Sequence, residues 1–349
     1  MKKLLILLDG MDDEPIHSLG GSTPREVASM PGLDYMCRKG TSRMMMTIPI
    51  GNSPSTDVAV PNILGYHVPP KFSGRTWLEA IGGDIEIKAE DICLRCNLIR
   101  TENNHVMSHS ADNISDNDAK VIIDKLNEVF GTKRISFHSG KGYRNLLRIS
   151  NCNSEITVTP VHELLGKEVT SLLVKSSDIQ LQQSLNHIIT KSADILSGMS
   201  YRANGIALWA PGRQPIHPFH HISGAMVAGV NLVKGIGKAF GMEVMEVKGA
   251  TGDCNTNFTG KLHSAIEALS THDFVILHIE APDEAAHNKN PKQKIEVLET
   301  IDRLILSPLL EQHLDIEIRV QADHATSSIT GRHLNLPVKV ITYRLNHQK

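Results

Sequence analysis

The sequence gives no sign of the covalent or metal cross-links that stabilise some proteins, which are disulfide bonds and structural zinc sites. Its five cysteines are an odd number without regular spacing, which argues against a disulfide framework. Cys93 and Cys96 form one CxxC pair with no second pair. Because a zinc knuckle needs four ligands, we expect these two residues to be buried thiols.

Long apolar runs and a strong net charge are also lacking. The first apolar run, Leu4–Leu8, is shorter than the roughly 7–15 residues of a signal-peptide core, and Asp9 ends it. No stretch approaches the ~20 apolar residues of a membrane span. The net charge of −2 gives no general attraction to nucleic acid. We therefore expect a cytoplasmic protein with a small substrate and without membrane or nucleic-acid partners, and the oligomeric state is left open.

The order of expected strands and helices divides the 349 residues into three segments. Residues 1–85 and 215–349 alternate strands with helices, which indicates one α/β domain with a mostly parallel sheet flanked by helices. Residues 86–214 change to short β-prone segments with two helices, so an inserted α+β cap domain is expected there. Within the outer segments, Thr23–Lys39 and residues 222–240 are each expected to form one helix.

Three expected apolar strands of the outer segments lead into acidic or histidine side chains. The strands and the residues that follow them are Lys3–Leu8 with Asp9, Phe274–Glu280 with Asp283 and His287, and Ile316–Gln321 with Asp323 and His324. Parallel sheets bind their ligands beyond the carboxyl ends of the strands. We therefore expect these side chains to meet at one edge of the sheet.

The spacing of these residues suits metal ions. Asp283 and His287 lie four apart, so a helix that begins after Pro282 would place both on one face, where they can share an ion. His333 follows nine residues after His324. Each residue alone would pass for a helix cap or a solvated loop residue. Together the three carboxylates and three imidazoles would suffice for two ions roughly 4 Å apart, as in two-metal phosphoryl-transfer enzymes.

These residues belong to longer motifs that resemble the archaeal-type cofactor-independent phosphoglycerate mutases of the alkaline phosphatase superfamily. The matching stretches follow the family order over most of the chain: LLDGMDD, GGSTPREVASMPGLDYM, STDVAVPNILGY, SGRTWLEAIGG, GYRNLL, VHELLGK, VKGIGKAFGMEV, KGATGDCNTNF, DFVILHIEAPDEAAH and ADHATSSITGRHLNLPV. The resemblance implies an alkaline-phosphatase-like fold with an inserted cap domain. It also implies the interconversion of 3-phosphoglycerate and 2-phosphoglycerate.

The resemblance further implies two divalent metal ions. One ion would be held by Asp283, His287 and His333. The other would be held by Asp9, Asp323, His324 and the hydroxyl of the nucleophile. Mixed carboxylate and imidazole ligands suit manganese or zinc better than magnesium. Such ions lower the pKa of a bound hydroxyl and neutralise the oxygens of the transferring phosphoryl group.

The nucleophile is the first departure from the family. The family's Gly-Ser-Asp-x-Ala matches Ser55 to Ala59, so Thr56 stands in the place of the family's serine. The resemblance therefore implies that Thr56 is both phosphoryl acceptor and metal ligand. Ser53 and Ser55 are near enough that a shifted register is left open. Val58–Leu64 is expected to be helical, and the partial positive charge of a helix N-terminus would favour a phosphoenzyme.

Further family positions would bind the substrate. They are Arg75, Arg95, Asn97, Arg144 and Arg213. Arginine suits phosphate and carboxylate because its planar fork donates two hydrogen bonds. A surface salt bridge is the alternative reading for each arginine.

Other departures favour an alternative activity. Asn255 replaces an acid of the family motif, and the chain ends at Lys349, where the archaeal-type mutases continue for some tens of residues. Together with Thr56, these changes favour a phosphomonoesterase or a small-alcohol phosphotransferase that resembles homoserine kinases. A degenerate binding protein is a third hypothesis, and the intact metal ligands argue against it.

Overall fold

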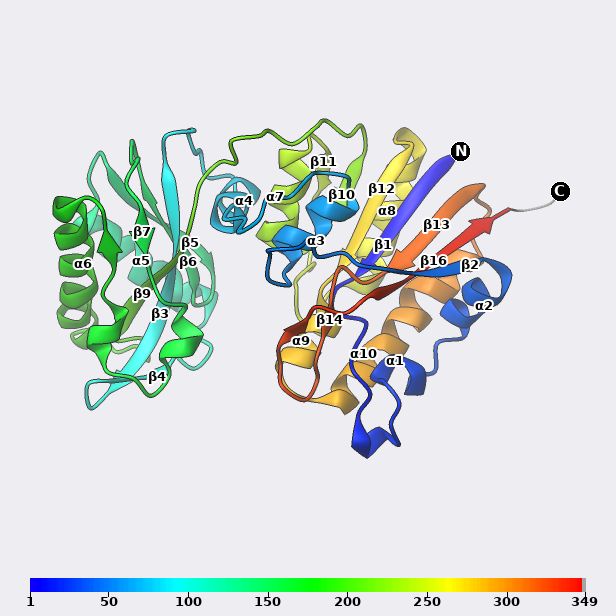
Figure 1. Cartoon of the computed structure of the whole chain (residues 1–349), viewed down its shortest axis with the longest axis horizontal. Coiled ribbons are helices and arrows are strands. Elements are labelled where there is room, and N and C mark those ends of the chain that lie inside the picture. Colours follow the sequence, from blue (N-terminus) through cyan, green and yellow to red (C-terminus); the bar gives the residue numbers. More distant parts are fainter. Residues whose placement is uncertain (347–349) are drawn as a thin grey trace. The chain divides into compact units, whose positions relative to one another are not determined.

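The computed structural model describes residues 1–346, which fall into two compact units (Figure 1). The first unit joins Met1–Phe72 to the described residues from Pro218 onward, and the second is Ser73–His217. The segment expected as an inserted cap, 86–214, lies inside the second unit. That this unit acts as a cap stays a prediction.

A seven-stranded sheet forms the centre of the first unit, in the order β11-β10-β12-β1-β13-β16-β2. Its strands are β1 (Lys2–Leu8), β2 (Thr41–Met45), β10 (Ala225–Val227), β11 (Glu243–Met245), β12 (Phe274–Ile279), β13 (Ile316–Gln321) and β16 (Val338–Leu345). The five strands from β11 to β13 run parallel, and β16 is antiparallel to both of its neighbours. The expected α/β class with a mostly parallel sheet is therefore confirmed.

The strand pattern of β1 shows how the two faces of this sheet are used. Leu4, Ile6 and Leu8 belong to the large aliphatic core, because alternate side chains of a strand point to the same face. The helices that pack on that core are α2 (Pro31–Lys39), α8 (Phe258–Thr271), α10 (Pro291–Ile301), the π-helical turn Asp302–Leu306 and α11 (Ser307–Leu310). Leu5 points to the opposite face, beside the end of α3 (Thr56–Ile63), which in turn packs on α7 (Asn231–Ala239).

Two segments expected to be single helices are divided in the structure. Thr23–Lys39 forms α1 (Pro24–Val27) and α2, because Pro31 disfavours the helical region for the residue before it, and Met30 lies outside that region at φ −126° and ψ 67°. The expected N-cap is confirmed, since Thr23 and Glu26 form a capping box. Residues 222–240 contain strand β10 before α7. The apolar run Ala225–Val227 fits a buried strand as well as a helix, and periodicity alone cannot separate the two in so short a run.

The second unit has its own sheet and its own aliphatic core. Its antiparallel strands are β3 (Ile92–Glu102), β4 (His105–Ser108), β5 (Ile135–Lys141), β6 (Arg144–Ile149) and β9 (Gly205–Gly212). Its helices are α4 (Arg75–Gly82), α5 (Asp116–Phe130) and α6 (Ile179–Ser197), with short pieces at β7 (Ile156–Thr157), β8 (Lys175–Ser176), Val161–Leu164 and Val169–Leu172. Cys93 and Cys96 of β3 are buried free thiols, as expected.

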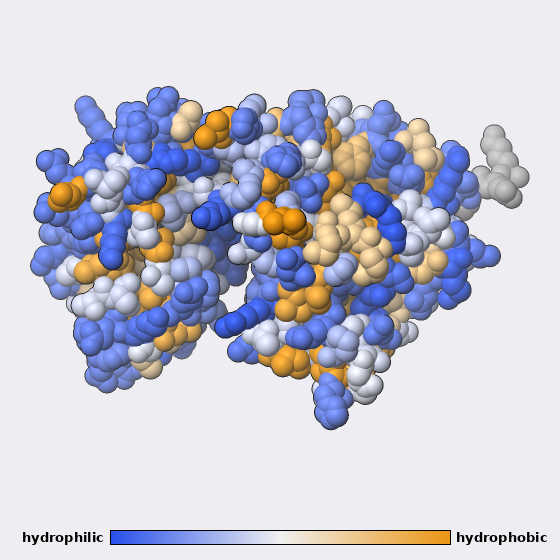
Figure 2. Space-filling model, in the orientation of Figure 1, coloured by the Kyte–Doolittle hydropathy of each residue, from blue (hydrophilic) through white to orange (hydrophobic). Residues whose placement is uncertain are grey.

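None of the helices within residues 1–346 combines the length and the apolarity that a bilayer span needs. Figure 2 shows hydrophilic residues over most of the visible face, with apolar residues among them. Scattered apolar side chains of this kind are normal on protein surfaces.

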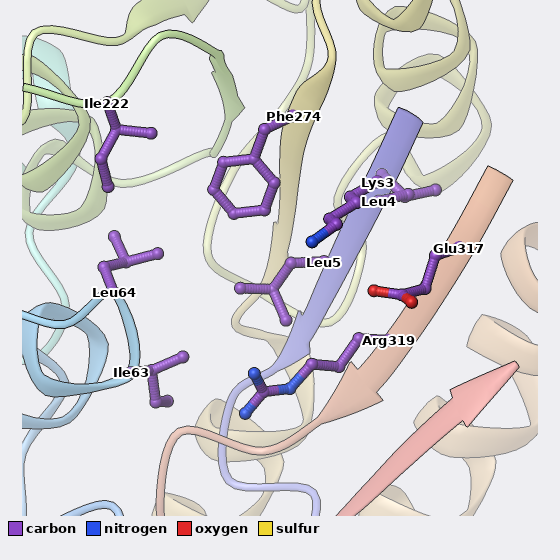
Figure 3. A pocket seen from close by; sticks show the side chains of 9 residues that line it. All are labelled: Lys3, Leu4, Leu5, Ile63, Leu64, Ile222, Phe274, Glu317 and Arg319. Carbon is purple, nitrogen blue, oxygen red and sulfur yellow. The ribbon is translucent and has the colours of Figure 1, made fainter. Parts of the chain in front are cut away.

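A cavity of about 240 Å³ in the first unit lies beside residues near the amino ends of three strands (Figure 3). Lys3 of β1, Phe274 of β12 and Glu317 of β13 contribute to its wall. The acids and histidines expected to form a site lie at the other ends of these strands. Since parallel sheets bind their ligands beyond the carboxyl ends, we locate the site by its side chains and not by this cavity.

Candidate metal centre

The carboxyl ends of β1, β12 and β13 bring together the side chains that follow them. Asp9 comes directly after β1. Asp323 and His324 follow β13 with one residue, Ala322, in between. Thr56 is the first residue of α3. Its Oγ1 lies 3.5 Å from Asp9 Oδ2 and 3.5 Å from His324 Nε2. The sheet therefore gathers the expected residues at one edge.

Asp283, His287 and His333 form the first group of candidate ligands. Asp283 and His287 lie one turn apart on α9 (Ala281–His287), as expected from their spacing. His287 Nε2 lies 3.0 Å from Asp283 Oδ2, and His333 Nε2 lies 3.5 Å from Asp283 Oδ1. The candidate ligand atoms of the three residues all lie within 4.8 Å of one another. This spacing suits three ligands of one ion.

The tautomers of the two histidines test whether this group fits a cation. His287 Nδ1 lies 2.8 Å from the carbonyl oxygen of Gly331, and His333 Nδ1 lies 3.0 Å from that of Pro54. A carbonyl only accepts hydrogen bonds, so each Nδ1 must carry a proton. The two Nε2 atoms then face each other at 3.1 Å and need a cation or a proton between them. The pattern is typical of metal-binding histidines, so these residues fit a metal.

The pKa values of this group show what competes with a metal. Burial lowers the pKa of His287, but the hydrogen bond and charge of Asp283 outweigh burial and raise it to about 9. Burial raises the pKa of Asp283, and its hydrogen bonds to His287 and His333 outweigh that effect and hold it well below its usual range. A proton on His287 therefore occupies the position that a metal ion would take.

Asp9, Asp323 and His324 form the second group with Thr56. His324 Nε2 lies 3.6 Å from Asp9 Oδ1 and 3.5 Å from Asp323 Oδ2, and all three side chains are buried. Asp9 Oδ1 and Asp323 Oδ2 have no hydrogen-bond partner among residues 1–346. Burial, followed by the charges of Asp323 and Asp283, raises the pKa of Asp9 well above its usual range. A divalent cation would neutralise these crowded carboxylates, so this group also fits a metal.

His278, which lies in β12, was not among the site residues predicted from the sequence. It is fully buried, and its Nε2 lies 3.4 Å from Asp9 Oδ2. With Asp9 and Asp323 it forms a further group of candidate ligand atoms within 4.8 Å of one another. Burial lowers the pKa of His278 to about 4, so the ring is neutral at pH 7 and able to bind a metal or donate to Asp9. A histidine inside the apolar strand FVILHI was the signal for it.

The residues expected to bind substrate lie in the second unit. Arg75 and Arg95 both pair with Glu79, with Arg75 Nε 3.2 Å from Oε1 and Arg95 Nε 2.8 Å from Oε2. Burial raises the pKa of Glu79, but Arg95, Arg75 and the more distant Arg144 outweigh it and lower that pKa. These three arginines and one carboxylate make a cluster with excess positive charge.

The side chains of Asn97 and Arg213 form hydrogen bonds within the second unit. Asn97 is buried, donates to the carbonyl of His109 at 2.9 Å and accepts from Trp209 Nε1 at 2.9 Å. Arg213 donates to the carbonyls of Cys152 and Ser154. Their role in substrate binding stays a prediction, and the structure gives both a packing role as well.

A mostly parallel sheet whose carboxyl ends carry buried clusters of carboxylates and imidazoles is typical of a metal-dependent α/β enzyme. Comparison with known proteins makes the class specific. Residues 37–201 match the family described as 2,3-bisphosphoglycerate-independent phosphoglycerate mutase. The chain belongs to this family, in its archaeal type.

Relatives of known name cover nearly the whole chain. A probable 2,3-bisphosphoglycerate-independent phosphoglycerate mutase of Geobacter sulfurreducens is 35% identical over 98% of this chain and 90% of its own length. The mutase of Methanosarcina barkeri is 35% identical over 99% of this chain and 90% of its own length.

Solved structures share the fold. A protein of Pyrococcus horikoshii matches with a TM-score of 0.79 and 25% identity, covering 98% of this chain and 87% of its own. The cofactor-independent phosphoglycerate mutase from Thermoplasma acidophilum matches with a TM-score of 0.60 and 24% identity, covering 98% of this chain and 90% of its own. These likenesses extend over both units of the chain.

Proposed function

We propose that this chain interconverts 3-phosphoglycerate and 2-phosphoglycerate through a phosphoenzyme on Thr56. Family membership supports the reaction. The observation that carries the assignment of the nucleophile is the position of Thr56 Oγ1, 3.5 Å from both Asp9 Oδ2 and His324 Nε2. Among residues 1–346, the hydroxyls of Ser53 and Ser55 have no such contact with the candidate ligands, which favours the register that selects Thr56.

The reaction needs two transfers of one phosphoryl group. In the first, Thr56 Oγ1 forms a bond to phosphorus, the bond from phosphorus to the glycerate oxygen breaks, and that oxygen ends with the proton that Thr56 loses. In the second, the other glycerate hydroxyl forms the bond, and Thr56 regains a proton as its bond to phosphorus breaks. Divalent cations, manganese or zinc, held by the two groups of ligands would lower the pKa of the hydroxyl and neutralise the phosphoryl oxygens. The N-terminus of α3 adds partial positive charge beside Thr56.

The same centre would serve other acceptors. If water or another small alcohol takes the phosphoryl group, the chain is a phosphomonoesterase or a phosphotransferase. Thr56 and Asn255, which replace a serine and an acid of the family motifs, are the observations that favour this second candidate. Parallel assays of isomerisation, phosphate release and transfer to added alcohols, each with Mn²⁺, separate the activities. Dominant release or transfer would contradict the mutase proposal.

The remaining expectations belong to the same proposal. A small phosphorylated substrate follows from the family's reaction. We retain the cytoplasm as the expected location, and we expect neither nucleic acid nor a membrane as a partner. We expect the metal to be manganese or zinc in preference to magnesium, because the ligands include both carboxylates and imidazoles.

The affinity of the first group for a metal should depend on pH. The pKa of His287 is raised to about 9, so below that pH the ring carries a proton that the metal must displace. The affinity for Mn²⁺ should therefore weaken as the pH falls, by about tenfold per pH unit for one displaced proton, and level off above pH 9. Competition titrations between about pH 6.5 and about pH 8.5 measure this slope. An affinity that is flat over this range would contradict the expectation.

Substrate affinity should depend on the arginine cluster around Glu79. Of the two arginines that pair with Glu79, Arg75 is the more exposed, with 31% of the side chain accessible against 12% for Arg95, and is therefore the better placed of the two to meet a ligand. Arg75→Gln should raise KM about tenfold, because one hydrogen bond between charged groups contributes about 1.5–3 kcal/mol. Arg100→Gln is the matched control, since within residues 1–346 Arg100 pairs with Glu102 and Asp112 and not with Glu79. Equal KM values for both variants would show that Arg75 does not bind the substrate.

A further inference from the structure

Thr326 lies between the two groups of candidate ligands. It belongs to β14 (Ala325–Thr326), which pairs antiparallel with β15 (His333–Leu334) and places Thr326 opposite His333. Its side chain is fully buried. We propose that Thr326 is a positioning residue that couples the two metal groups through a single hydroxyl. This inference rests on the proposed function.

The hydroxyl of Thr326 contacts one ligand of each group. Its Oγ1 lies 2.6 Å from Asp283 Oδ1 and 3.2 Å from His324 Nδ1. An ionised carboxylate only accepts hydrogen bonds, so the single proton of the hydroxyl goes to Asp283. The oxygen of Thr326 must then accept the proton that His324 carries on Nδ1.

This chain of hydrogen bonds fixes the tautomer of His324. With the proton on Nδ1, the free lone pair is on Nε2, the atom that faces Thr56 Oγ1 at 3.5 Å and Asp9 Oδ1 at 3.6 Å. One hydroxyl therefore orients Asp283 for the first group and prepares His324 for the second. Partners of this kind typically change metal affinity by about 10–100-fold when they are removed.

The backbone of Thr326 is held by a second, independent set of contacts. Its N–H donates to the carbonyl of Asp12 at 3.0 Å, and its carbonyl accepts from Lys294 Nζ at 2.8 Å. Lys294 is fully buried and pairs with Asp13 Oδ2 at 2.9 Å. A buried lysine is costly unless it is paired and hydrogen-bonded, and here both conditions are met. The hydroxyl is thus presented from a fixed backbone, as a positioning role requires.

Three variants test the proposal by calorimetric titration with Mn²⁺. Thr326→Val keeps the shape and removes the hydroxyl, so both groups should bind Mn²⁺ at least about tenfold more weakly. Thr326→Ser keeps the hydroxyl and should bind within about threefold of the wild type at both groups. Thr47→Val is the matched control, because Thr47 is a fully buried threonine of the same unit whose hydroxyl has no partner within residues 1–346. It should bind as the wild type does.

The outcomes separate this inference from the proposed function. If the wild type binds two ions and Thr326→Val also binds both with unchanged affinity, or loses affinity at one group alone, the coupling role is wrong and the function stands. If the wild type binds neither Mn²⁺ nor Zn²⁺, the proposed function fails and the inference fails with it.

A second measurement needs no variant at the position in question and serves if Thr326→Val does not fold. Nitrogen NMR of the metal-free wild type should show His324 with its proton on Nδ1, after its signals are assigned by comparison with His324→Asn. A proton on Nε2 would overturn the proposal. A residue that only filled space would leave the tautomer of His324 undetermined.

Discussion

Asp283→Ala is expected to leave the chain with one divalent ion in place of two. Asp283 is the carboxylate shared by His287 and His333, with oxygens 3.0 and 3.5 Å from their Nε2 atoms. Its removal leaves two imidazoles as the candidate ligands of the first group. Turnover should fall by about a thousandfold or more, because a bound metal stabilises the transition state by several kcal/mol. His333→Ala should have the same effect on the number of bound ions.

Elemental analysis of the purified variants measures this result. Asp34→Ala is a suitable control, since Asp34 is an exposed acid in α2, away from the candidate ligands, and it should retain both ions. Full occupancy in both Asp283→Ala and His333→Ala would contradict the assignment of the first group. The assignment of the second group would be unaffected by that outcome.

Thr56→Ala should abolish turnover while the chain stays folded. The variant removes the oxygen that forms the bond to phosphorus, and within residues 1–346 no other hydroxyl contacts both Asp9 and His324 Nε2. A loss of at least about a thousandfold is expected, since nucleophile removal eliminates the covalent route. The melting temperature should shift by only a few degrees, because one hydroxyl and one methyl group are lost.

Two further variants identify the hydroxyl. Thr56→Ser should retain activity within about tenfold, because serine supplies the same oxygen without the methyl group. Ser55→Ala should leave turnover largely intact, since Ser55 is the N-cap of α3 and its side chain makes no capping hydrogen bond. If Ser55→Ala were inactive and Thr56→Ala active, the nucleophile would be Ser55 and not Thr56. The assignment of the two groups of metal ligands would be unaffected.

The edge of the sheet where the candidate ligands meet was predictable from the sequence. Leu4–Leu8 and Phe274–Ile279 are apolar runs too short for buried helices, and acids follow both. The rule that parallel strands end at one edge then places Asp9 beside Asp283 without any knowledge of the fold. The distances between them depend on strand register, which the apolar pattern does not specify.

Other elements were missed for identifiable physical reasons. Ala225–Val227 is fully buried and contacts both α7 and α8, and a run that is apolar on both faces has no period that separates a strand from a helix. Strand β2 is exposed along most of its length, so its sequence has no apolar alternation to reveal it. Thr326 was missed because a buried hydroxyl that joins two ligands looks like any threonine in a loop.

The division into two units was visible in part. The change to short β-prone segments after residue 85 marks the second sheet, which begins at Ile92. The compact unit also contains α4, from Arg75 to Gly82, which the sequence analysis assigned to the first segment. Helix α4 contacts β3 and β9, and such long-range packing leaves no local signal in the sequence.

The most direct test of the central claim is to trap the phosphoenzyme. The chain, loaded with Mn²⁺ and mixed with 3-phosphoglycerate, would be quenched in acid within one turnover, digested and mapped by mass spectrometry. The proposed function predicts one phosphoryl group on the peptide that contains Thr56, with fragmentation locating it on Thr56 and no signal in Thr56→Ala. A phosphoryl group on Ser53 or Ser55, or turnover of the wild type without any phosphorylated peptide, would contradict it.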